Sequence, residues 1–393
     1  MNIRFLDGFR GIAALVVLIG HARMLLFEGF TWGYKLHPEV YSALDKALMY
    51  GFGIFRYGHQ MVVLFFILSG FVIHLRFSNR ENRVPLHLKT FWFRRFKRLY
   101  PPLVFVILLT FILDSLGKSY GWSIYFQQTP YENINREIVS ITDLPTLIGN
   151  LLFLMSVYVT TFGSNVVTWS LMFEWWFYIL YPLFYFLVKR FGFRKVSVAI
   201  FILFVISILK NDLVPLLFWR VMNGFVVWWM GACLVEVWTN RHGTTKRLYA
   251  LSPSFLVLLP IAFILKEKNI EALYPVFDLV FGLGFTSLIA LCLRLKPQNW
   301  FIRLLNFLKP LGDCSYTLYL IHVPIFVFIS GWLINKDGYL PKHHFYVIGL
   351  TILIPILAYY LHFLIEKPFT KSHKKSVEPK VPNFTISQFQ NNP

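Results

Sequence analysis

Cysteine is scarce in this sequence, and its three copies are far apart. Cys233, Cys292 and Cys314 stand among apolar neighbours in a chain of 393 residues. This spacing provides neither a disulfide framework nor the paired Cys-x-x-Cys ligands of a zinc site. We therefore interpret them as small buried side chains and predict no metal site.

Charged residues are also few, and acidic residues are the rarer kind. Only 15% of the chain is charged, with 19 acidic residues against 38 Lys and Arg residues. Hydrophobic residues make up 56% of the chain and aromatic residues 19%. This composition excludes an ordinary soluble globular domain and is typical of a polytopic membrane protein.

The sequence lacks long linkers, low-complexity tracts and evident internal repeats. We therefore predict one integral-membrane domain over residues 1–366. The segment 367–393 is polar, basic and contains proline, which is typical of a disordered tail. We also expect no separate signal peptide, because the first apolar stretch begins almost at Met1 without a small-residue cleavage pattern after it.

Ten apolar stretches are long enough, or nearly so, to cross a hydrocarbon core about 30 Å thick. They lie approximately at 9–28, 57–75, 99–116, 168–188, 194–210, 213–236, 249–265, 272–293, 313–334 and 345–365. A further apolar run, 144–162, contains Pro145, Gly149 and Asn150, and we interpret it as a re-entrant or interfacial segment. The predicted fold class is therefore all-α, a polytopic transmembrane helical bundle of about ten spans.

The basic residues are distributed unevenly between the two sides of this bundle. With the N-terminus inside, 26 of the 38 Lys and Arg residues fall on the inner side and ten on the outer side. An eleventh span at 144–162 would place Lys189, Arg190 and every later basic loop outside, against the positive-inside rule. We therefore predict that both termini are cytoplasmic. The net charge of +19 then reflects topology, and no nucleic-acid partner is expected.

The first span carries ionisable residues that are costly inside a membrane. Arg10 and His21 are almost three helical turns apart, so they share one helix face, with His21 roughly 16 Å deeper. Ionisable groups in a span usually face a protein interior or a wet cavity and mark function. Two alternatives stay open: Arg10 as a topology anchor, and His21 as a hydrogen-bonding packing residue.

A basic cluster, Arg94-Arg95-Phe96-Lys97-Arg98, opens the third span. Arg95 and Arg98 are three residues apart, so their guanidinium groups can converge on one phosphate-bearing ligand. The cluster can equally anchor the helix or contact anionic membrane lipid. In the second span, Ser69-Gly70 favours close helix packing.

Glu174 lies at the outer start of the fourth span, about 9 Å deep, close to the expected depth of His21. A carboxylate that orients or charge-balances an imidazole is a common acid–base arrangement. The alternative is a salt bridge from Glu174 to Arg23 or Arg220.

Polar residues also enter the ninth span from its inner end. Ser315, Tyr319 and His322 stand at positions i, i+4 and i+7 and so share one helix face. For His322 alone, which stands beside Pro324, a packing role is favoured.

Taken together, these stretches resemble the membrane acyltransferase-3 family. The segments that carry the resemblance are, in order, LDGFRGIAALVVLIGH, FFILSGF, RRFKRLYPP, TWSLMFEWWFYILYP, LGDCSYTLYLIHVP and IEKPF. They extend from Leu6 to Phe369, nearly the whole chain. One departure is Trp175-Trp176, where the family usually has polar residues after the glutamate, and it leaves the identity of the acceptor open.

The resemblance implies an O-acyltransferase of the bacterial inner membrane. Its co-substrate would be acetyl-CoA or another acyl-CoA, with no tightly bound cofactor, and its acceptor a hydroxyl of a surface saccharide or lipid-linked glycan. His21 and Glu174 would be catalytic, His21 as general base or transient acyl carrier. The donor would be bound by Arg10, Arg95, Arg98, Ser315, Tyr316 and His322.

Two other classes of function are alternatives to an acyltransferase. A proton-coupled membrane transporter also has polar residues at mid-membrane, but no paired short or broken segments are visible in two halves of this sequence. A structural or assembly protein would explain neither the Arg10–His21 pair nor the ordered motifs.

Overall fold

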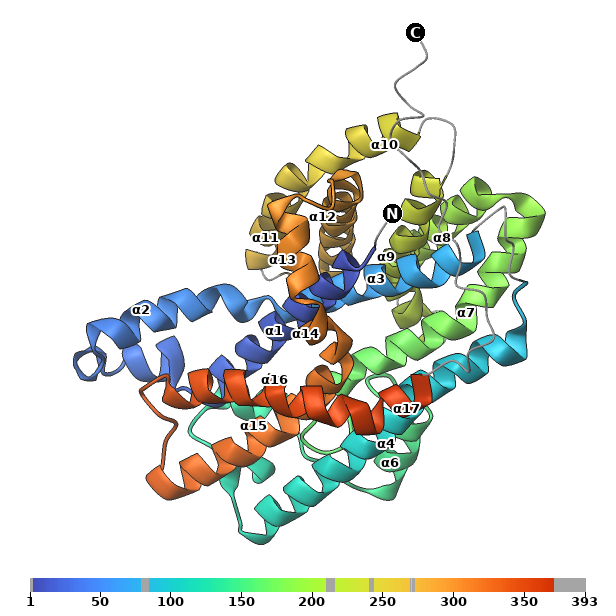
Figure 1. The fold of residues 1–393 in the computed structure, drawn as a ribbon. Coiled ribbons are helices and arrows are strands. Elements are labelled where there is room, and N and C mark those ends of the chain that lie inside the picture. Colours follow the sequence, from blue (N-terminus) through green and yellow to red (C-terminus); the bar gives the residue numbers. More distant parts are fainter. Residues whose placement is uncertain are drawn as a thin grey trace.

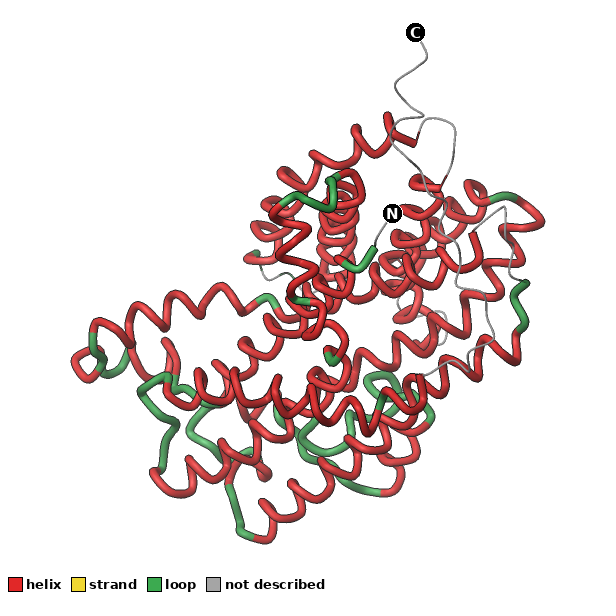
Figure 2. The backbone as a smooth tube through the Cα atoms, in the orientation of Figure 1, coloured by secondary structure: helices red, strands yellow, loops and turns green. Residues whose placement is uncertain are grey.

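The computed structural model describes residues 3–78, 85–209, 216–239, 244–268, 270 and 273–370. Within these ranges the regular structure is helical, and the only β-type pairing is an isolated bridge between Met155 and Val159 (Figure 2). The predicted all-α fold class is confirmed.

The helices differ widely in length. The long ones are α1 (Phe5–Leu25), α3 (Gly58–Ser78), α4 (Leu88–Ser119), α7 (Trp169–Phe191), α8 (Phe193–Leu209), α9 (Leu216–Thr239), α11 (Phe255–Glu267), α12 (Tyr274–Arg294), α15 (Ser315–Asp337) and α16 (Phe345–Ile365). The short ones are α2 (Ala43–Phe52), α5 (Glu132–Glu137), α6 (Leu144–Leu151), α10 (Thr244–Leu251), α13 (Trp300–Phe307), α14 (Lys309–Asp313) and α17 (Lys367–Thr370). Single π or 3-10 turns are η1 (Phe30–Tyr34), η2 (Pro38–Val40), η3 (Gly53–Arg56), η4 (Ser123–Phe126), η5 (Val166–Thr168) and η6 (Ser252–Ser254).

Each of the ten predicted spans coincides with one of the long helices. Among the described residues, nine helical stretches are long and apolar enough to cross a membrane, so the chain is an integral membrane protein. The remaining predicted span, 194–210, is the fifth along the chain and corresponds to α8. This helix has 17 residues and is followed by residues outside the description. The predicted tail begins with α17, and 371–393 lie outside the described residues.

The apolar run 144–162 does not form a membrane-spanning helix. Its helix α6 ends after eight residues, and Phe153 and Ser156 then adopt positive φ angles of 55° and 62°. The buried Asn150 side chain accepts from the backbone N–H of Phe162 at 3.0 Å and so folds the segment back on itself. This agrees with its interpretation as a re-entrant or interfacial segment.

The two tryptophans that depart from the family pattern hold this segment against α7. The ring of Trp175 stacks on Phe153 with centroids 4.9 Å apart, and Trp176 Nε1 donates to the Phe153 carbonyl at 3.0 Å. An irregular backbone is tolerated at membrane depth only where protein covers it. Trp175 and Trp176 provide part of that cover.

Close glycine contacts bring α3 and α9 together. A Cβ atom on Gly70 would lie 2.0 Å from the Trp228 carbonyl oxygen, and one on Gly231 would lie 2.1 Å from that of Ile67. Only glycine allows this approach, which is how small residues drive helix association in lipid. The prediction of close packing at Ser69-Gly70 is confirmed for Gly70.

Helix α1 runs through the middle of the bundle and positions its polar residues by similar contacts. A Cβ atom on Gly312 would lie 1.9 Å from the Asp7 carbonyl oxygen, so α14 packs directly on the first turns of α1. Further along, α1 packs against α3 and α15, with α16 alongside α15 (Figure 1). The helices around α1 therefore belong to both halves of the sequence.

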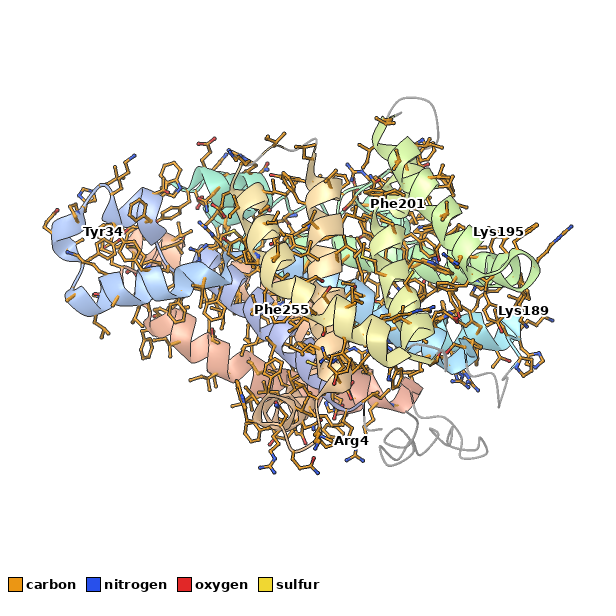
Figure 3. The ribbon with its side chains drawn as sticks, turned by 90° about the horizontal axis from the view of Figure 1, so that it is seen from above. Arg4, Tyr34, Lys189, Lys195, Phe201 and Phe255 are labelled. Carbon is orange, nitrogen blue, oxygen red and sulfur yellow. The ribbon has the colours of Figure 1, made fainter. Side chains whose placement is uncertain are left out.

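Two of the connecting segments that sequence analysis assigned to opposite sides of the membrane lie at opposite ends of the molecule (Figure 3). Tyr34, in the predicted outer segment 29–56, is at one end in Figure 3, and Lys189 and Lys195 are at the other. Which end faces the cytoplasm stays a prediction.

Cysteine labelling in intact cells tests this topology. In a chain without its native cysteines, we expect Arg190→Cys to be protected from a membrane-impermeant maleimide. Tyr120→Cys, at a 65% exposed position after α4, should be labelled as the positive control. Labelling of position 190 from outside, as well as position 120, would contradict the ten-span arrangement and favour an eleventh span between them.

Candidate active site

Two histidines from distant parts of the chain meet in the bundle. His21 is on α1 and His322 on α15, and these helices pack together. Nε2 of His322 lies 3.1 Å from Nδ1 of His21, and the ring centroids are 5.1 Å apart. His322 is buried and His21 is half-buried. His322 was predicted on the donor path; the structure makes it the direct partner of His21.

The hydrogen bonds around this pair assign the proton positions. Nδ1 of His21 lies 3.0 Å from the Val17 carbonyl oxygen, and Nδ1 of His322 lies 3.1 Å from that of Leu318. A carbonyl oxygen only accepts, so both Nδ1 atoms carry hydrogen in the neutral rings. The single Nδ1–H of His21 is then shared between the Val17 carbonyl oxygen and Nε2 of His322. The lone pair of His21 is left on Nε2, which has no hydrogen-bond partner among the described residues.

Glu174 lies on α7 and is engaged differently from the prediction. Its carboxylate accepts a short hydrogen bond from Tyr178, four residues further along the same helix. The hydrogen-bonding partners of His21 within the described ranges are Val17 and His322, so Glu174 does not orient the imidazole directly. The spacing of Glu174 and Tyr178 on one helix face was visible in the sequence but was not used.

The alternative left open for Glu174, a salt bridge to Arg23 or Arg220, is not among the contacts of the described residues. Arg220 donates to the Ser156 carbonyl oxygen instead. The buried Nε of Arg23 has no hydrogen-bond partner in the described part of the chain. The cations within electrostatic range of Glu174 are Arg10, Arg95 and Arg98.

These three arginines form a cationic cluster at the N-terminal end of α1. Arg10 forms an ion pair with Asp7 at 2.9 Å, and its side chain is only 16% exposed. Arg95 and Arg98 come from α4, and Arg95 lies over the ring of Tyr178 at 5.2 Å. Arg10 and Arg98 repel one another electrostatically. The structure thus brings Arg10 of α1 together with Arg95 and Arg98 of α4.

The cluster contains polar atoms that lack hydrogen-bond partners. Nε of Arg95 and Nε of Arg98 are both buried, and neither has a hydrogen-bond partner among the described residues. A buried donor without a partner costs about 1–3 kcal/mol, and more when the group is charged. An anionic ligand that accepts from these atoms would remove that cost.

A second carboxylate, Glu366, contributes to the charge balance. It lies within electrostatic range of Arg98 and Arg10 and accepts from Thr317 Oγ1 at 3.1 Å. The residue belongs to the IEKPF segment, which carried the family resemblance but was not assigned a site role.

The remaining predicted donor-binding residues lie at the start of α15. Ser315 is buried and donates to the Gly312 carbonyl at 2.7 Å, which is a local helix-start contact. The Tyr316 hydroxyl donates to the Leu99 carbonyl at 3.4 Å and is within electrostatic range of Arg98. Tyr316 therefore borders the arginine cluster, whereas the hydroxyl of Ser315 is already used by the backbone.

Tyr319 connects α15 with the start of α7. Its hydroxyl donates to the Val167 carbonyl at 3.0 Å and accepts from Ser170 at 2.9 Å. Its ring centroid is 6.0 Å from that of His322. These contacts fix α15, and with it His322, relative to α7.

Comparison with known proteins agrees with this architecture. The family profile described as an acyltransferase domain matches residues 3–363. The chain belongs to the acyltransferase-3 family. The predicted resemblance is confirmed, and the two histidines and three arginines lie within the matched range of this acyltransferase domain.

The individual relatives of this acyltransferase-3 family member share about a quarter of their aligned residues with it. O-acetyltransferase OatA of Staphylococcus aureus strain NCTC 8325 / PS 47 is 26% identical over 349 residues, which cover 81% of this chain and 54% of that protein. OatA of strain COL gives the same values. The chain thus spans about half the length of these curated relatives. No solved structure matches it significantly.

Proposed function

We propose that this chain is an O-acyltransferase that moves an acyl group, in the simplest case acetyl, from acyl-CoA to a hydroxyl of a saccharide. The observation that carries the proposal is the histidine pair, which leaves Nε2 of His21 with a free lone pair inside the bundle. Membership of the acyltransferase-3 family and the names of the O-acetyltransferase relatives support it.

The arginine cluster is suited to the donor. Phosphate groups accept charge-assisted hydrogen bonds from guanidinium groups, and Arg95 and Arg98 have buried Nε atoms ready to donate. Arg10 is on the same helix as His21, almost three turns before it. A CoA molecule whose phosphates lie at the arginines could therefore extend its thioester along α1 toward His21.

The chemical step uses the lone pair on Nε2 of His21. This nitrogen takes the proton of the acceptor hydroxyl while the hydroxyl oxygen attacks the thioester carbonyl carbon. The carbon–sulfur bond breaks, and the CoA thiolate takes the proton back from the imidazolium. The products are an O-acyl ester and CoA with a free thiol, and His21 returns to its starting state.

His322 has a positioning role in this scheme. Proton uptake makes His21 a cation, and the hydrogen bond from its Nδ1–H to Nε2 of His322 then becomes charge-assisted and stronger. Glu174 lies among the arginines, so its role is to hold Tyr178 and balance their charge.

The two ends of α1 suit transfer across a membrane. The arginine cluster lies at its N-terminal end, which we predict from the distribution of basic residues to face the cytoplasm, where acyl-CoA is made. The acceptor would then approach from the opposite side. This arrangement corresponds to the inner membrane of a bacterium.

Isotope transfer tests the proposed reaction. Membrane vesicles that contain the chain should transfer radiolabel from [1-14C]acetyl-CoA to the glycan fraction, and mild alkali should release it, as expected for an ester. Vesicles without the chain, and acetyl-CoA labelled in the adenine ring, are the controls. Absence of alkali-labile label, together with proton-dependent uptake of a solute, would favour the transporter alternative.

A further inference from the structure

A cavity lies at the end of α1 opposite the arginine cluster. Its volume is about 790 Å³, and it is enclosed by the end of α1, the turn η1, the helices α2 and α5 and the turn η3. In Figure 1, α2 extends away from the main bundle beside this end of α1. The volume falls within the range of about 300–1,000 Å³ that is typical of small-molecule sites.

Positive charge is concentrated at one part of the cavity wall. Arg23 and Arg56 both line it and repel one another electrostatically. Arg56 pairs with Glu267 at 2.9 Å, but the buried Nε of Arg23 has no hydrogen-bond partner in the described ranges. A positively charged wall with an unused donor favours a ligand that carries an anionic group.

The cavity also has two carboxylates, Glu28 and Glu132, but the charged group that acts on Arg23 within the described residues is Arg56. Glu28 accepts from the Tyr41 hydroxyl at 2.8 Å. Burial, reinforced by the adjacent Glu28 carboxylate, raises the pKa of Tyr41 well above its usual range, so this hydroxyl keeps its proton and continues to donate. Glu132 pairs with Arg136 at 3.3 Å. Glu28 keeps its negative charge, so the positive charge offered to a ligand is local to Arg23, with a contribution from Arg56.

Aromatic rings supply the apolar part of the lining. Phe30 is 49% exposed and Tyr50 is 62% exposed, and their ring centroids lie 6.4 Å apart. Trp32 and Tyr57 also line the cavity. Aromatic faces beside polar groups suit a sugar ring, which has apolar faces and a polar rim of hydroxyl groups.

The cavity approaches His21 from this end of α1. Met24 lines it and stands three residues after His21, so the two side chains share a helix face about one turn, or roughly 5 Å, apart. The lining of the cavity thus begins about one helical turn beyond His21 on α1, on the side away from Arg95 and Arg98.

We propose that this cavity is the acceptor site, and that the acceptor is a saccharide with a carboxylate or phosphate group bound by Arg23 and Arg56. The identification as an acceptor site rests on the proposed function. The selectivity for an anionic saccharide rests on the cavity alone and can be measured without any transfer reaction.

Calorimetry with paired oligosaccharides tests this selectivity on the purified full chain. Hyaluronan tetrasaccharide, which carries carboxylates, should bind at least about tenfold more tightly than the neutral chitotetraose. Hydrogen bonds to charged groups support a loss of about 10- to 100-fold for Arg23→Gln. Tyr50→Ala should weaken both saccharides equally, because a ring contact does not depend on charge. Arg190→Gln, an exposed arginine at the far end of the molecule, is the matched control.

Further arms separate the possible sources of the anion. Glucose 1-phosphate tests a phosphate group in place of the carboxylate, and phosphatidylglycerol vesicles test a lipid headgroup. Equal affinity for the two tetrasaccharides, or unchanged binding in folded Arg23→Gln, would overturn the proposal, as would binding of the lipid alone. If Arg23→Gln fails to fold, Arg56→Gln, at a side chain 52% exposed, gives the same comparison.

A variant of the histidine pair separates this inference from the proposed reaction. His21→Ala should bind hyaluronan tetrasaccharide with unchanged affinity while losing transfer. Binding without any transfer in the native chain would contradict the proposed reaction and leave the anionic saccharide site standing. Transfer to a glycan by a chain that does not bind the anionic saccharide in this cavity would contradict the inference alone.

Discussion

Replacement of His21 by alanine is expected to abolish acyl transfer while the protein still folds and inserts. A positioned general base contributes roughly 10²–10⁴-fold to the rate, and a nucleophile can contribute more. Insertion should persist, because removing a polar group from a span does not oppose it. The measurement is the transfer rate per amount of purified, monodisperse protein, with thermal stability recorded on the same sample.

The histidine pair gives graded controls for this result. His322→Ala should lower the rate less than His21→Ala, because the base remains and loses only its charge-assisted partner. His37→Ala, at a side chain 57% exposed outside the site, should keep the parental rate. A packing role predicts the reverse for His21→Ala: unstable protein with near-normal specific activity. A folded His21→Ala protein that transfers at the parental rate would remove His21 from the mechanism.

The same variants distinguish a general base from a transient acyl carrier. If His21 carries the acyl group, incubation with labelled acetyl-CoA and no acceptor should leave label on the native chain and none on His21→Ala. A general base leaves no covalent label in either protein. The unprotonated Nε2 is compatible with both chemistries, so this trapping experiment decides between them.

The double substitution Arg95→Ala and Arg98→Ala is expected to weaken acetyl-CoA binding strongly. Each lost hydrogen bond to a charged phosphate costs about 1.5–3 kcal/mol, so the Kd should rise by at least about tenfold. Neither Nε atom has a hydrogen-bond partner among the described residues, so the donors that the change removes are free to bind phosphate. Calorimetric titration of the purified protein with acetyl-CoA provides the measurement.

Neighbouring residues on α4 supply a matched control. Arg94→Ala with Lys97→Ala removes the same amount of charge from the same helix turn, at two exposed positions. This pair should leave acetyl-CoA affinity within about twofold, because exposed charges act at a distance that salt screens. Equal weakening in both double variants would show that the cluster attracts acetyl-CoA only through its general positive charge. Unchanged affinity in Arg95→Ala with Arg98→Ala would show that the two arginines do not bind the donor and serve only as a topology anchor.

The helical architecture could be read from the sequence because its causes are local. A membrane span requires a run of apolar residues of a certain length, and the ten predicted stretches all correspond to helices. The apolar run 144–162 is the exception that does not form a spanning helix. Its cause is also local, because Pro145, Gly149 and Asn150 interrupt the run. The structure adds that Asn150 and the tryptophans of α7 hold the segment in place.

The members of the candidate site could also be named from the sequence, because ionisable residues are rare in apolar spans. His21 and Arg10 stood out for this reason, and Arg95 and Arg98 for their spacing in the basic cluster that precedes the third span. Periodicity further indicated which residues share a face of one helix. It could not indicate how one helix is rotated against another, because that depends on packing contacts such as those of Gly312 with α1.

Tertiary structure therefore decided the partnerships. The sequence suggested that Glu174 would meet His21, since the two residues have similar expected depths. The rotation of α7 instead directs Glu174 toward Tyr178 and the arginines, and α15 brings His322 to within 3.1 Å of His21. Apolar length and residue type thus determined the spans and the candidate residues. The tautomer of His21, its partner 301 positions away and the cavity beyond Met24 arise only when the helices pack.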